Sequence, residues 1–360
     1  MNSKPEFHII PSVNRMPETE RTRILENLGF GRAFTDHMVT VSWEVGKDWH
    51  DARVRERGPF QLDPATAVLH YAQEIFEGLK AYRTDQGSIT LFRPEENARR
   101  FQSSAKRMAM PVMPEELFIS AIEELARIDR EWVPSGEGSL YLRPFMFATE
   151  VFLGVRPSSK YTFCVIASPV GAYFKGGEKP ITVWISDTFS RAAPGGTGAA
   201  KCGGNYAASL LAQAEAAEKG CDQVVFLDAA KHRWVEELGG MNIFFVMEDG
   251  TLITPPLGTI LPGITRASLI TIARDAGLSV EEMAYPFGRW REDAATGRLR
   301  EVFACGTAAV VAPIGSVRHA GGEFAIADGA VGPLTRKLRD TLVGIQKGRQ
   351  ADVYGWLHKI

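Results

Sequence analysis

Hydrophobic residues at helical spacing predict a first helix in the early part of the chain. Asp63 is followed by Pro64, a pair typical of an N-cap and the first residue of a helix. Leu69, Ala72 and Phe76 then recur on one face of a 3.6-residue repeat. The pattern predicts an amphipathic helix that starts near Asp63 and buries these three side chains.

A second amphipathic helix is predicted to begin at Pro94. Phe101, Ala105 and Met108 mark its apolar face, and Arg100 lies on the flank of that face. An arginine that is buried or half-buried needs an anion, because an uncompensated charge is costly away from water. The sequence therefore predicts a negatively charged partner for Arg100.

The second half of the chain alternates between element types. We expect a helix over 205–219 that Gly220 closes, and then a strand over Gln223–Leu227. Asp249-Gly250 is typical of a hairpin turn between two strands. This mixture indicates an α/β or α+β domain.

Two further helices are predicted towards the C-terminus. Gly263-Ile264-Thr265 begins one that runs to about Ala276, with Gly277 as its cap. Pro333 begins the other. The residues expected to face inward from that last helix are Leu334, Leu338, Leu342 and Ile345.

The length of 360 residues indicates two domains, since a single core rarely grows beyond about 250–300 residues. The segment PVGAYFKGGEKP, residues 169–180, interrupts the apolar pattern with glycine, proline and charge. We therefore predict a smaller N-terminal α/β domain over 1–168, an interdomain loop over 169–180 and a larger C-terminal domain over 181–360. A cleft between domains is a common place for a site.

The charge and composition exclude several classes of function. The 41 basic and 43 acidic residues give a net charge of −2, so no excess of positive charge favours nucleic acid. Residues 1–15 do not have the apolar core of a signal peptide, and no apolar run approaches the roughly 18 residues of a membrane helix. We expect a cytoplasmic protein with reduced thiols, because no CxxC pair occurs among Cys164, Cys202, Cys221 and Cys305.

The strongest chemical signal is the glycine-rich segment PGGTGAAKCGG, residues 194–204, which contains Lys201. A nucleotide-binding P-loop would require glycine before the lysine and serine or threonine after it. Ala200 and Cys202 occupy those positions, so two of the four fixed residues are missing. A non-catalytic nucleotide-binding module is therefore the weaker interpretation of this segment.

A lysine in a crowded site has a second use, because it can form a Schiff base with a carbonyl cofactor. Pyridoxal phosphate is the common case. It needs an anion-binding group for its phosphate, a carboxylate at its pyridinium nitrogen and usually a hydroxyl near its ring oxygen. Gly263-Ile264-Thr265 and Gly306-Thr307-Ala308 offer backbone N–H groups and hydroxyls to a phosphate. Tyr206 supplies a phenol, and Glu236 or Glu237 supplies a carboxylate.

Each of these residues also has a plainer interpretation. Lys201 fits a solvated lysine of a flexible loop, and a threonine at a helix start fits a simple cap. Tyr206 fits a core tyrosine whose hydroxyl is satisfied elsewhere. The two glutamates fit a surface turn. The residues taken one at a time leave these alternatives open.

Taken together, the motifs resemble the branched-chain-amino-acid aminotransferases, which are fold type IV pyridoxal-phosphate enzymes. The similarity extends over almost the whole chain and does not depend on any single motif. The segments that carry it are FGRAFTDHM, LHYAQEIFEGLKAYR, LFRPEENARRF, LYLRP, PVGAYF, GGTGAAKCGGNYA, EELGGMN, ILPGITR and VFACGTAAVV.

The resemblance implies a role for individual residues around the cofactor. Lys201 becomes the catalytic Schiff-base lysine, Tyr206 the partner of the ring oxygen and Glu237 the partner of the pyridinium nitrogen. It assigns the phosphate to Arg100, to Ile264 and Thr265, and to Thr307. The implied substrate pocket is formed by Phe30, Tyr71, Phe76, Tyr141, Arg143, Tyr173, Thr307 and Ala308, with Leu153 and Val155 from a partner subunit.

The same resemblance implies the fold and the reaction. We expect a mixed α/β (α+β) chain of two domains with the active site between them, and a homodimer without a metal ion. The expected reaction moves the amino group of L-leucine, L-isoleucine or L-valine to 2-oxoglutarate by a ping-pong mechanism, with Arg143 near the side-chain carboxylate of glutamate. The alternatives within the fold type are a D-amino-acid aminotransferase and an aminodeoxychorismate lyase.

Overall fold

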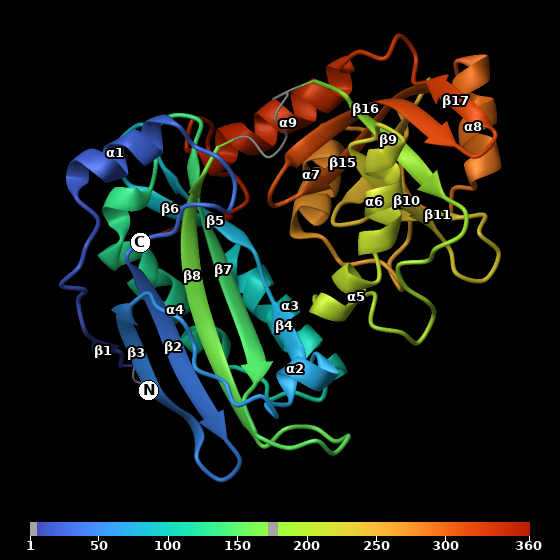
Figure 1. Cartoon of the computed structure of the whole chain (residues 1–360). Coiled ribbons are helices and arrows are strands. Elements are labelled where there is room, and N and C mark those ends of the chain that lie inside the picture. Colours follow the sequence, from blue (N-terminus) through green and yellow to red (C-terminus); the bar gives the residue numbers. More distant parts are fainter. Residues whose placement is uncertain (1–5, 172–178) are drawn as a thin grey trace. The chain divides into compact units, whose positions relative to one another are not determined.

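The computed structural model describes residues 6–171 and 179–360, and the chain divides into two compact units (Figure 1). The first unit comprises the described residues up to 171, together with Ala200–Gly203 and Ile345–Ile360. The second comprises residues 179–199 and Gly204–Gly344. The short segment that contains Lys201 therefore packs with the N-terminal part of the chain, although its neighbours in sequence belong to the other unit.

The first unit is built on a mostly antiparallel sheet that helices cover on one face. The strand order is β1-β3-β2-β8-β7-β5-β6-β18, and β4 also pairs with β7. The strands are β1 (His8–Ile9), β2 (His37–Glu44), β3 (Asp48–Glu56), β4 (Glu74–Phe76), β5 (Leu79–Arg83), β6 (Ile89–Phe92), β7 (Ser139–Ala148), β8 (Lys160–Val170) and β18 (Leu357–Lys359). The helices are α1 (Glu18–Glu26), α2 (Val68–Tyr71), α3 (Pro94–Arg107), α4 (Glu115–Ile128) and the 3₁₀ helix η1 (Arg130–Trp132).

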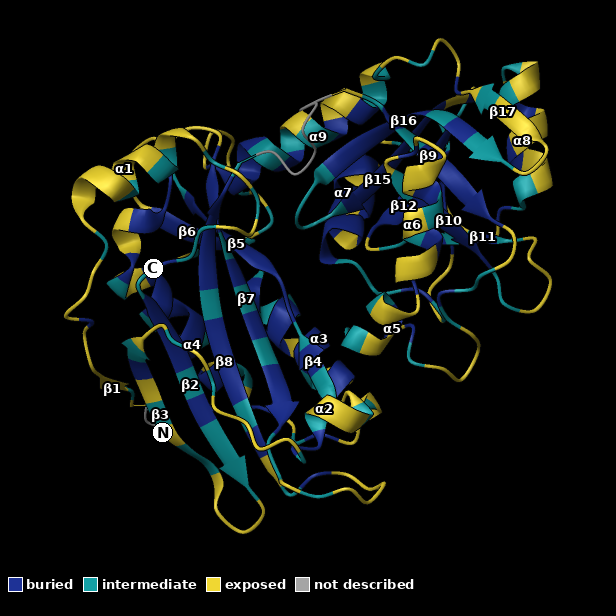
Figure 2. Cartoon of the chain, in the orientation of Figure 1, coloured by how far each residue is buried: buried dark blue, intermediate teal, exposed yellow. Residues whose placement is uncertain are grey.

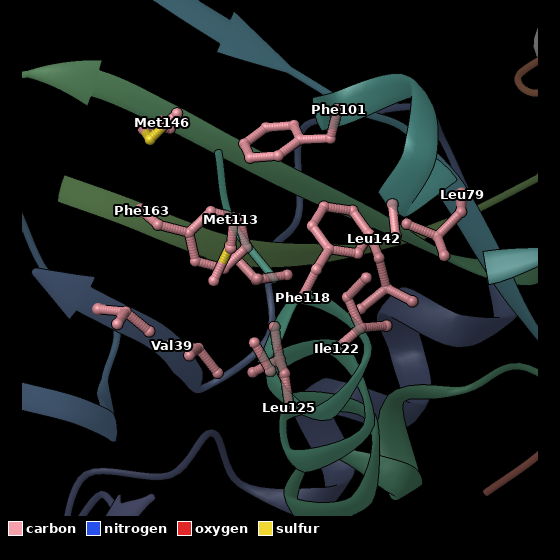
Figure 3. Packing of buried hydrophobic residues seen from close by; sticks show 14 of the residues in the cluster. Val39, Leu79, Phe101, Met113, Phe118, Ile122, Leu125, Leu142, Met146 and Phe163 are labelled. Carbon is pink, nitrogen blue, oxygen red and sulfur yellow. The ribbon is translucent and has the colours of Figure 1, made fainter. Parts of the chain in front are cut away.

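The core of the first unit lies between this sheet and helices α3 and α4. Phe101 of α3, Phe118 of α4 and Phe163 of β8 are fully buried, and the ring centroids of Phe101 and Phe118 are 5.2 Å apart. Figure 3 shows these rings together with Ile122 and Leu125 of α4 in one cluster. Burial of such side chains contributes roughly 1.5–3 kcal/mol each, which fixes α3 against the sheet.

The second unit has a mixed sheet with the strand order β11-β10-β9-β16-β15-β12-β13-β14, and β17 pairs with β16. Its strands are β9 (Ile181–Ser186), β10 (Gln223–Leu227), β11 (Val235–Leu238), β12 (Asn242–Met247), β13 (Leu252–Thr254), β14 (Val280–Glu282), β15 (Leu299–Gly306), β16 (Val310–His319) and β17 (Gly322–Ala325). Its helices are α5 (Gly203–Ala207), α6 (Leu210–Glu218), α7 (Ile264–Asp275), α8 (Phe287–Thr296) and α9 (Pro333–Gln346), of which α5 begins and α9 ends in the first unit. In each unit the sheet is largely buried (Figure 2).

The mixture of helices and strands in both units confirms the predicted α/β or α+β character. The helix from Pro94, the hairpin turn at Asp249-Gly250 and the helix that Gly277 follows are present where the sequence placed them. Gly250 and Gly277 have φ of +84° and +79°, a region that glycine adopts without strain. Among the described residues, no helix has the length and apolar composition that a membrane crossing requires.

Two helix predictions are wrong in detail. Only Val68–Tyr71 is helical in the first, because Ala72 takes a left-handed conformation and ends the helix, and Phe76 lies in β4 instead. Pairing of β4 with β7 outweighs the local helical spacing. The predicted 205–219 helix is divided into α5 and α6, and at the break the Ser209 hydroxyl donates to the Tyr206 carbonyl.

Candidate active site

The backbone around Lys201 is held by hydrogen bonds from both sides. The Lys201 N–H donates to the Ser104 hydroxyl of α3 at 2.9 Å, and the Lys201 carbonyl accepts from the Phe76 N–H at 2.9 Å. Two residues later, the Gly203 N–H donates to the Glu74 carboxylate. The Cys202 side chain is buried in the core of the first unit. A segment in the middle of the chain is thus fixed to α3 and β4.

The Lys201 side chain lies in a group of aromatic residues with one arginine. Lys201 Nζ is 4.8 Å from the centre of the Phe76 ring, and the Arg143 guanidinium carbon is also 4.8 Å from that centre. Arg143 donates to the Tyr141 hydroxyl at 3.2 Å. The Phe30 and Tyr141 ring centroids are 5.4 Å apart. The structure therefore brings Phe30, Phe76, Tyr141, Arg143 and Lys201 together.

The alternation of β7 explains why Tyr141 and Arg143 point to the same side. Successive side chains of a strand face opposite ways, and here Leu140 and Leu142 are fully buried in the core while Tyr141 and Arg143 are half-buried. Arg143 Nε is shielded from solvent and has no hydrogen-bond partner among the described residues. A shielded donor of this kind favours an anionic ligand, since leaving it unsatisfied costs about 1–3 kcal/mol.

Arg100 has the anion that the sequence analysis required. Its Nε and Nη2 atoms lie 2.8 Å and 2.7 Å from the two oxygens of the Glu77 carboxylate, and both side chains are buried. Asn97 also donates to Glu77, at 2.7 Å. A parallel pair of charge-assisted hydrogen bonds holds the guanidinium in one orientation. Sequence reasoning did not identify Glu77 as this partner, although the need for a buried carboxylate was evident.

Other residues of the predicted pocket lie in a second group. The Tyr71 hydroxyl donates to the Leu153 carbonyl, and the Tyr71 ring is 6.3 Å from that of Phe152. The side chains of Leu153 and Val155 are 65% and 89% exposed. Tyr173 lies outside the described residues.

In the second unit, Glu237 is the inward-facing acid of the pair that the sequence left open. It is 3% exposed, and its carboxylate lies 2.7 Å from Arg191 and 3.2 Å from both the Asn242 amide nitrogen and the Leu261 N–H. Glu236 is half-buried and accepts from the Thr259 hydroxyl at 2.5 Å, and burial raises the pKa of its carboxyl. The alternation of β11 therefore selects Glu237.

Contacts at three glycines of the second unit connect the predicted residues. A Cβ at Gly263 would overlap the Asn242 side chain, and a Cβ at Gly306 would lie 3.3 Å from Met241 Cγ and 3.5 Å from the Gly240 carbonyl. A Cβ at Gly240 would lie 3.8 Å from the Tyr206 ring. These contacts link the predicted residues into one neighbourhood, which we call the glycine group: Tyr206, Glu237, Gly240, Asn242, Gly263-Ile264-Thr265 and Gly306-Thr307.

The glycine group has the chemistry that pyridoxal phosphate requires. Ile264 and Thr265 form the first turn of α7, where backbone N–H groups and the helix dipole favour a phosphate. The hydroxyls of Thr265 and Thr307 are further donors, Glu237 is a buried carboxylate, and Tyr206 carries a phenol. Among residues 6–171 and 179–360, no set of three or more metal-ligating side chains comes together. The donor set suits a phosphate with a pyridinium ring.

Glu74, Ser104, Glu77, Arg191 and Asn242 are the residues of these groups that sequence reasoning missed. Their partners are distant along the chain: Ser104 and Lys201 are 97 residues apart, and Glu74 and Gly203 are 129 apart. The spacing of residues within one helix or strand cannot predict contacts between residues so far apart in the sequence.

Comparison with known proteins gives consistent matches. The family profile of amino-transferase class IV matches residues 74–317. The chain is 58% identical to a branched-chain-amino-acid aminotransferase of Mycolicibacterium smegmatis over 367 aligned positions, with 100% of both chains covered. Among solved structures it resembles the Escherichia coli branched-chain amino acid aminotransferase, with a TM-score of 0.73, 30% identity and 88% and 98% of the two chains covered. It also resembles the branched-chain amino acid aminotransferase from Thermobaculum terrenum in its PLP-form, with a TM-score of 0.72, 27% identity and 90% and 98% covered.

Proposed function

The chain belongs to the amino-transferase class IV family and, within it, to the branched-chain-amino-acid aminotransferases, and from this premise we propose how its residues carry out the reaction. The family confirms the predicted fold type IV architecture and the predicted enzyme class. The proposed reaction moves the amino group of L-leucine, L-isoleucine or L-valine to 2-oxoglutarate. The observation that carries this proposal is that Lys201 and a half-buried arginine, Arg143, both lie 4.8 Å from the centre of the Phe76 ring.

The proposed cofactor is pyridoxal phosphate, which supplies an electron sink for the carbanion formed at the substrate Cα. Lys201 Nζ would hold it covalently and then carry the proton at the substrate Cα. Glu237 would bind the pyridinium nitrogen, and its ion pair with Arg191 holds the carboxylate in place. Tyr206 would donate to the ring oxygen.

The phosphate would be bound by residues with different chemistry. Ile264 and Thr265 offer the N-terminal turn of α7, and Thr307 offers a hydroxyl in the turn between β15 and β16. Arg100 would contribute guanidinium N–H donors, while its ion pair with Glu77 holds the guanidinium in place. The proposed donors to the phosphate are therefore a helix N-terminus, a threonine hydroxyl and a guanidinium.

The substrate side chain would lie against the aromatic residues around Lys201. Phe30, Phe76 and Tyr141 provide apolar surface, and burying a leucine or valine side chain against it contributes roughly 1.5–3 kcal/mol. Arg143 would pair with the side-chain carboxylate when glutamate is bound. The α-carboxylate would be received by the backbone at Thr307 and Ala308. Tyr71 and Tyr173 remain proposed pocket residues.

We further propose a homodimer in which Leu153 and Val155 reach the pocket of the partner subunit. Both side chains are large, apolar and exposed, and they follow Val151, which is 55% exposed. An exposed apolar run of this kind favours burial against a second chain. For the compartment, we propose the cytoplasm, since Cys164, Cys202, Cys221 and Cys305 are all free and buried.

Replacing the proposed catalytic lysine tests the function directly. Lys201→Ala should fold but lose transamination of L-leucine by at least ~100-fold, because the group that moves the proton is removed. Borohydride reduction followed by peptide mapping should find a pyridoxyl group on Lys201 of the unchanged protein and on no residue of the variant. Lys47→Ala, at a lysine whose side chain is 63% exposed, is the matched control.

Two results would refute the proposal. Full activity in Lys201→Ala would remove Lys201 from the reaction. Turnover of D-alanine or aminodeoxychorismate without turnover of L-leucine, L-isoleucine and L-valine would instead assign the chain to another activity of the fold type.

A further inference from the structure

Ala200–Gly203 is the only part of residues 179–344, all of them described, that packs as part of the first unit. Two elements of that unit hydrogen-bond to it, α3 through Ser104 and β4 through Glu74 and Phe76. The Ser104 side chain is fully buried, so its hydroxyl has no competing solvent. The backbone on either side of Lys201 is thus fixed by groups that do not belong to the glycine-rich segment.

We propose that Glu74 and Ser104 are positioning residues that fix the Lys201–Gly203 backbone and thereby hold Lys201 Nζ at the reacting atoms. We call this pair the lysine clamp. The inference rests on the proposed role of Lys201 and adds to it two residues that act through its backbone. Ser104 acts at the N–H of the lysine itself, and Glu74 acts two residues after it.

Gly203 lets the Glu74 carboxylate approach the backbone closely. A Cβ at position 203 would overlap the Glu74 carboxylate oxygen, so a larger residue there would push the Glu74 side chain away from its place at the N–H. The φ of Gly203 is not in the positive region, so the backbone conformation by itself does not call for a glycine there. Glu74 and Gly203 are therefore matched to each other.

Placing the Glu74 carboxyl here costs free energy of desolvation. Burial raises the pKa of its carboxyl, while the Gly203 N–H and the positive charge of Arg143 act in the opposite direction. A half-buried carboxyl that made no hydrogen bond would be a net cost, since an apolar side chain could fill the same volume. The hydrogen bond from the Gly203 N–H offsets part of this cost and fixes the backbone next to Lys201.

The clamp matters because a lysine side chain has many rotamers. Ordering it costs conformational entropy, and any freedom in the backbone adds to the volume that Nζ explores. A displacement of about 1 Å at a reacting group can lower a rate by roughly 100-fold. A fixed Cα leaves only side-chain rotation to place Nζ.

The test removes each half of the clamp and measures both the backbone and the reaction. Glu74→Ala and Ser104→Ala should lower kcat roughly ten- to hundredfold with little change in KM, because Lys201 is misplaced while the substrate pocket is kept. In the cofactor-free protein, hydrogen exchange followed by mass spectrometry should show faster exchange of the peptide that contains residues 201–203. Glu74→Gln keeps an acceptor oxygen and should recover most of the kcat that Glu74→Ala loses.

The matched control for α3 is Ser103→Ala. Ser103 is the exposed neighbour of Ser104, and its hydroxyl donates to the Arg99 carbonyl within the helix. This variant should exchange and turn over like the unchanged protein. Circular dichroism of each variant separates loss of the clamp from loss of the fold.

A double variant tests the match between Glu74 and Gly203. Gly203→Ala alone should lower kcat, because the new methyl group displaces the carboxylate. When Gly203→Ala is added to Glu74→Ala, it should cause little further loss of kcat, because the overlapping carboxylate is already absent.

Two results would overturn the clamp. One is that the losses of kcat in Glu74→Ala and Gly203→Ala are additive in the double variant. The other is that Glu74→Ala and Ser104→Ala both keep the kcat and the hydrogen exchange of the unchanged protein. If those results accompany an inactive Lys201→Ala, only the clamp fails; an active Lys201→Ala refutes the proposed function itself.

Discussion

At the scale of single residues, the contacts of Arg143 indicate that it binds an anionic group of the substrate. Its Nη2 donates to Tyr141, its guanidinium lies over Phe76 and its Nε is shielded without a partner among the described residues. Arg143→Met keeps an apolar chain of similar length and removes the charge. The KM for 2-oxoglutarate should rise about ten- to hundredfold, the equivalent of a lost charge-assisted hydrogen bond, with little change for L-leucine. Steady-state kinetics with both substrates checks this.

The control for that prediction is Arg127→Met, at an exposed arginine that pairs with Glu123 and Glu124 along α4. Its KM values should match those of the unchanged enzyme. If KM rises equally for L-leucine and 2-oxoglutarate in Arg143→Met, the arginine supports the structure of the pocket and does not bind the side-chain carboxylate of the substrate.

At the scale of elements, strand β5 carries a buried lysine beside the C-terminal segment. Lys80 is 6% exposed, and burial together with the nearby charge of Lys347 lowers its pKa to about 7. Lys347 follows α9, donates to the Gly138 carbonyl at 2.8 Å and lies 5.6 Å from the centre of the Tyr82 ring. Its own pKa is also lowered by burial. Two cations therefore share the region where the C-terminal segment joins the first sheet.

This arrangement predicts a pH dependence of stability with a definite sign. Between about pH 7 and the ordinary lysine pKa of 10.5, the unfolded chain binds a proton at Lys80 that the folded chain does not. The free energy of unfolding therefore rises with pH across that window. Lys80→Met removes this contribution, so the Tm of the variant minus that of the unchanged protein should be largest near pH 7 and decrease towards pH 10.5.

Thermal unfolding followed by circular dichroism at several pH values measures that difference. Lys47→Met is the matched control, because Lys47 is exposed and its change should give a small difference that hardly varies with pH. A Tm difference for Lys80→Met that is constant over the window would contradict the role of burial.

At the scale of the whole molecule, the exposed apolar side chains favour association of two chains. Val155 is 89% exposed and Leu153 is 65% exposed, and Tyr71 holds the segment through the Leu153 carbonyl. Val155→Asp should shift the proposed dimer towards monomer, since a charge would then be buried in the interface. Sedimentation velocity at several protein concentrations measures this. Val13→Asp, at a valine that is 92% exposed in the N-terminal segment, should leave the distribution unchanged.

Local features of the chain determined many elements without help from the fold. The helix from Pro94, the strand Gln223–Leu227 and the hairpin at Asp249-Gly250 depend on spacing, β-branched composition and turn chemistry within a few residues. The helix predicted from Asp63 to Phe76 was wrong because its end is paired with β7, a strand far along the chain. The candidate residues around Lys201 were found largely through whole-chain resemblance.

The sequence by itself determined which reactive side chains are present. They are a lysine in a glycine-rich segment, an arginine on a helix flank that needs an anion, and two adjacent glutamates of which one faces inward. The tertiary structure decided which partner each group has. It selected Glu237 over Glu236 through the alternation of β11 and gave Glu77 to Arg100. It also placed Ser104 and Glu74 on the backbone of Lys201 and Gly203. Those choices depend on contacts between residues that are far apart along the chain, and such contacts exist only once the sheet and α3 have packed.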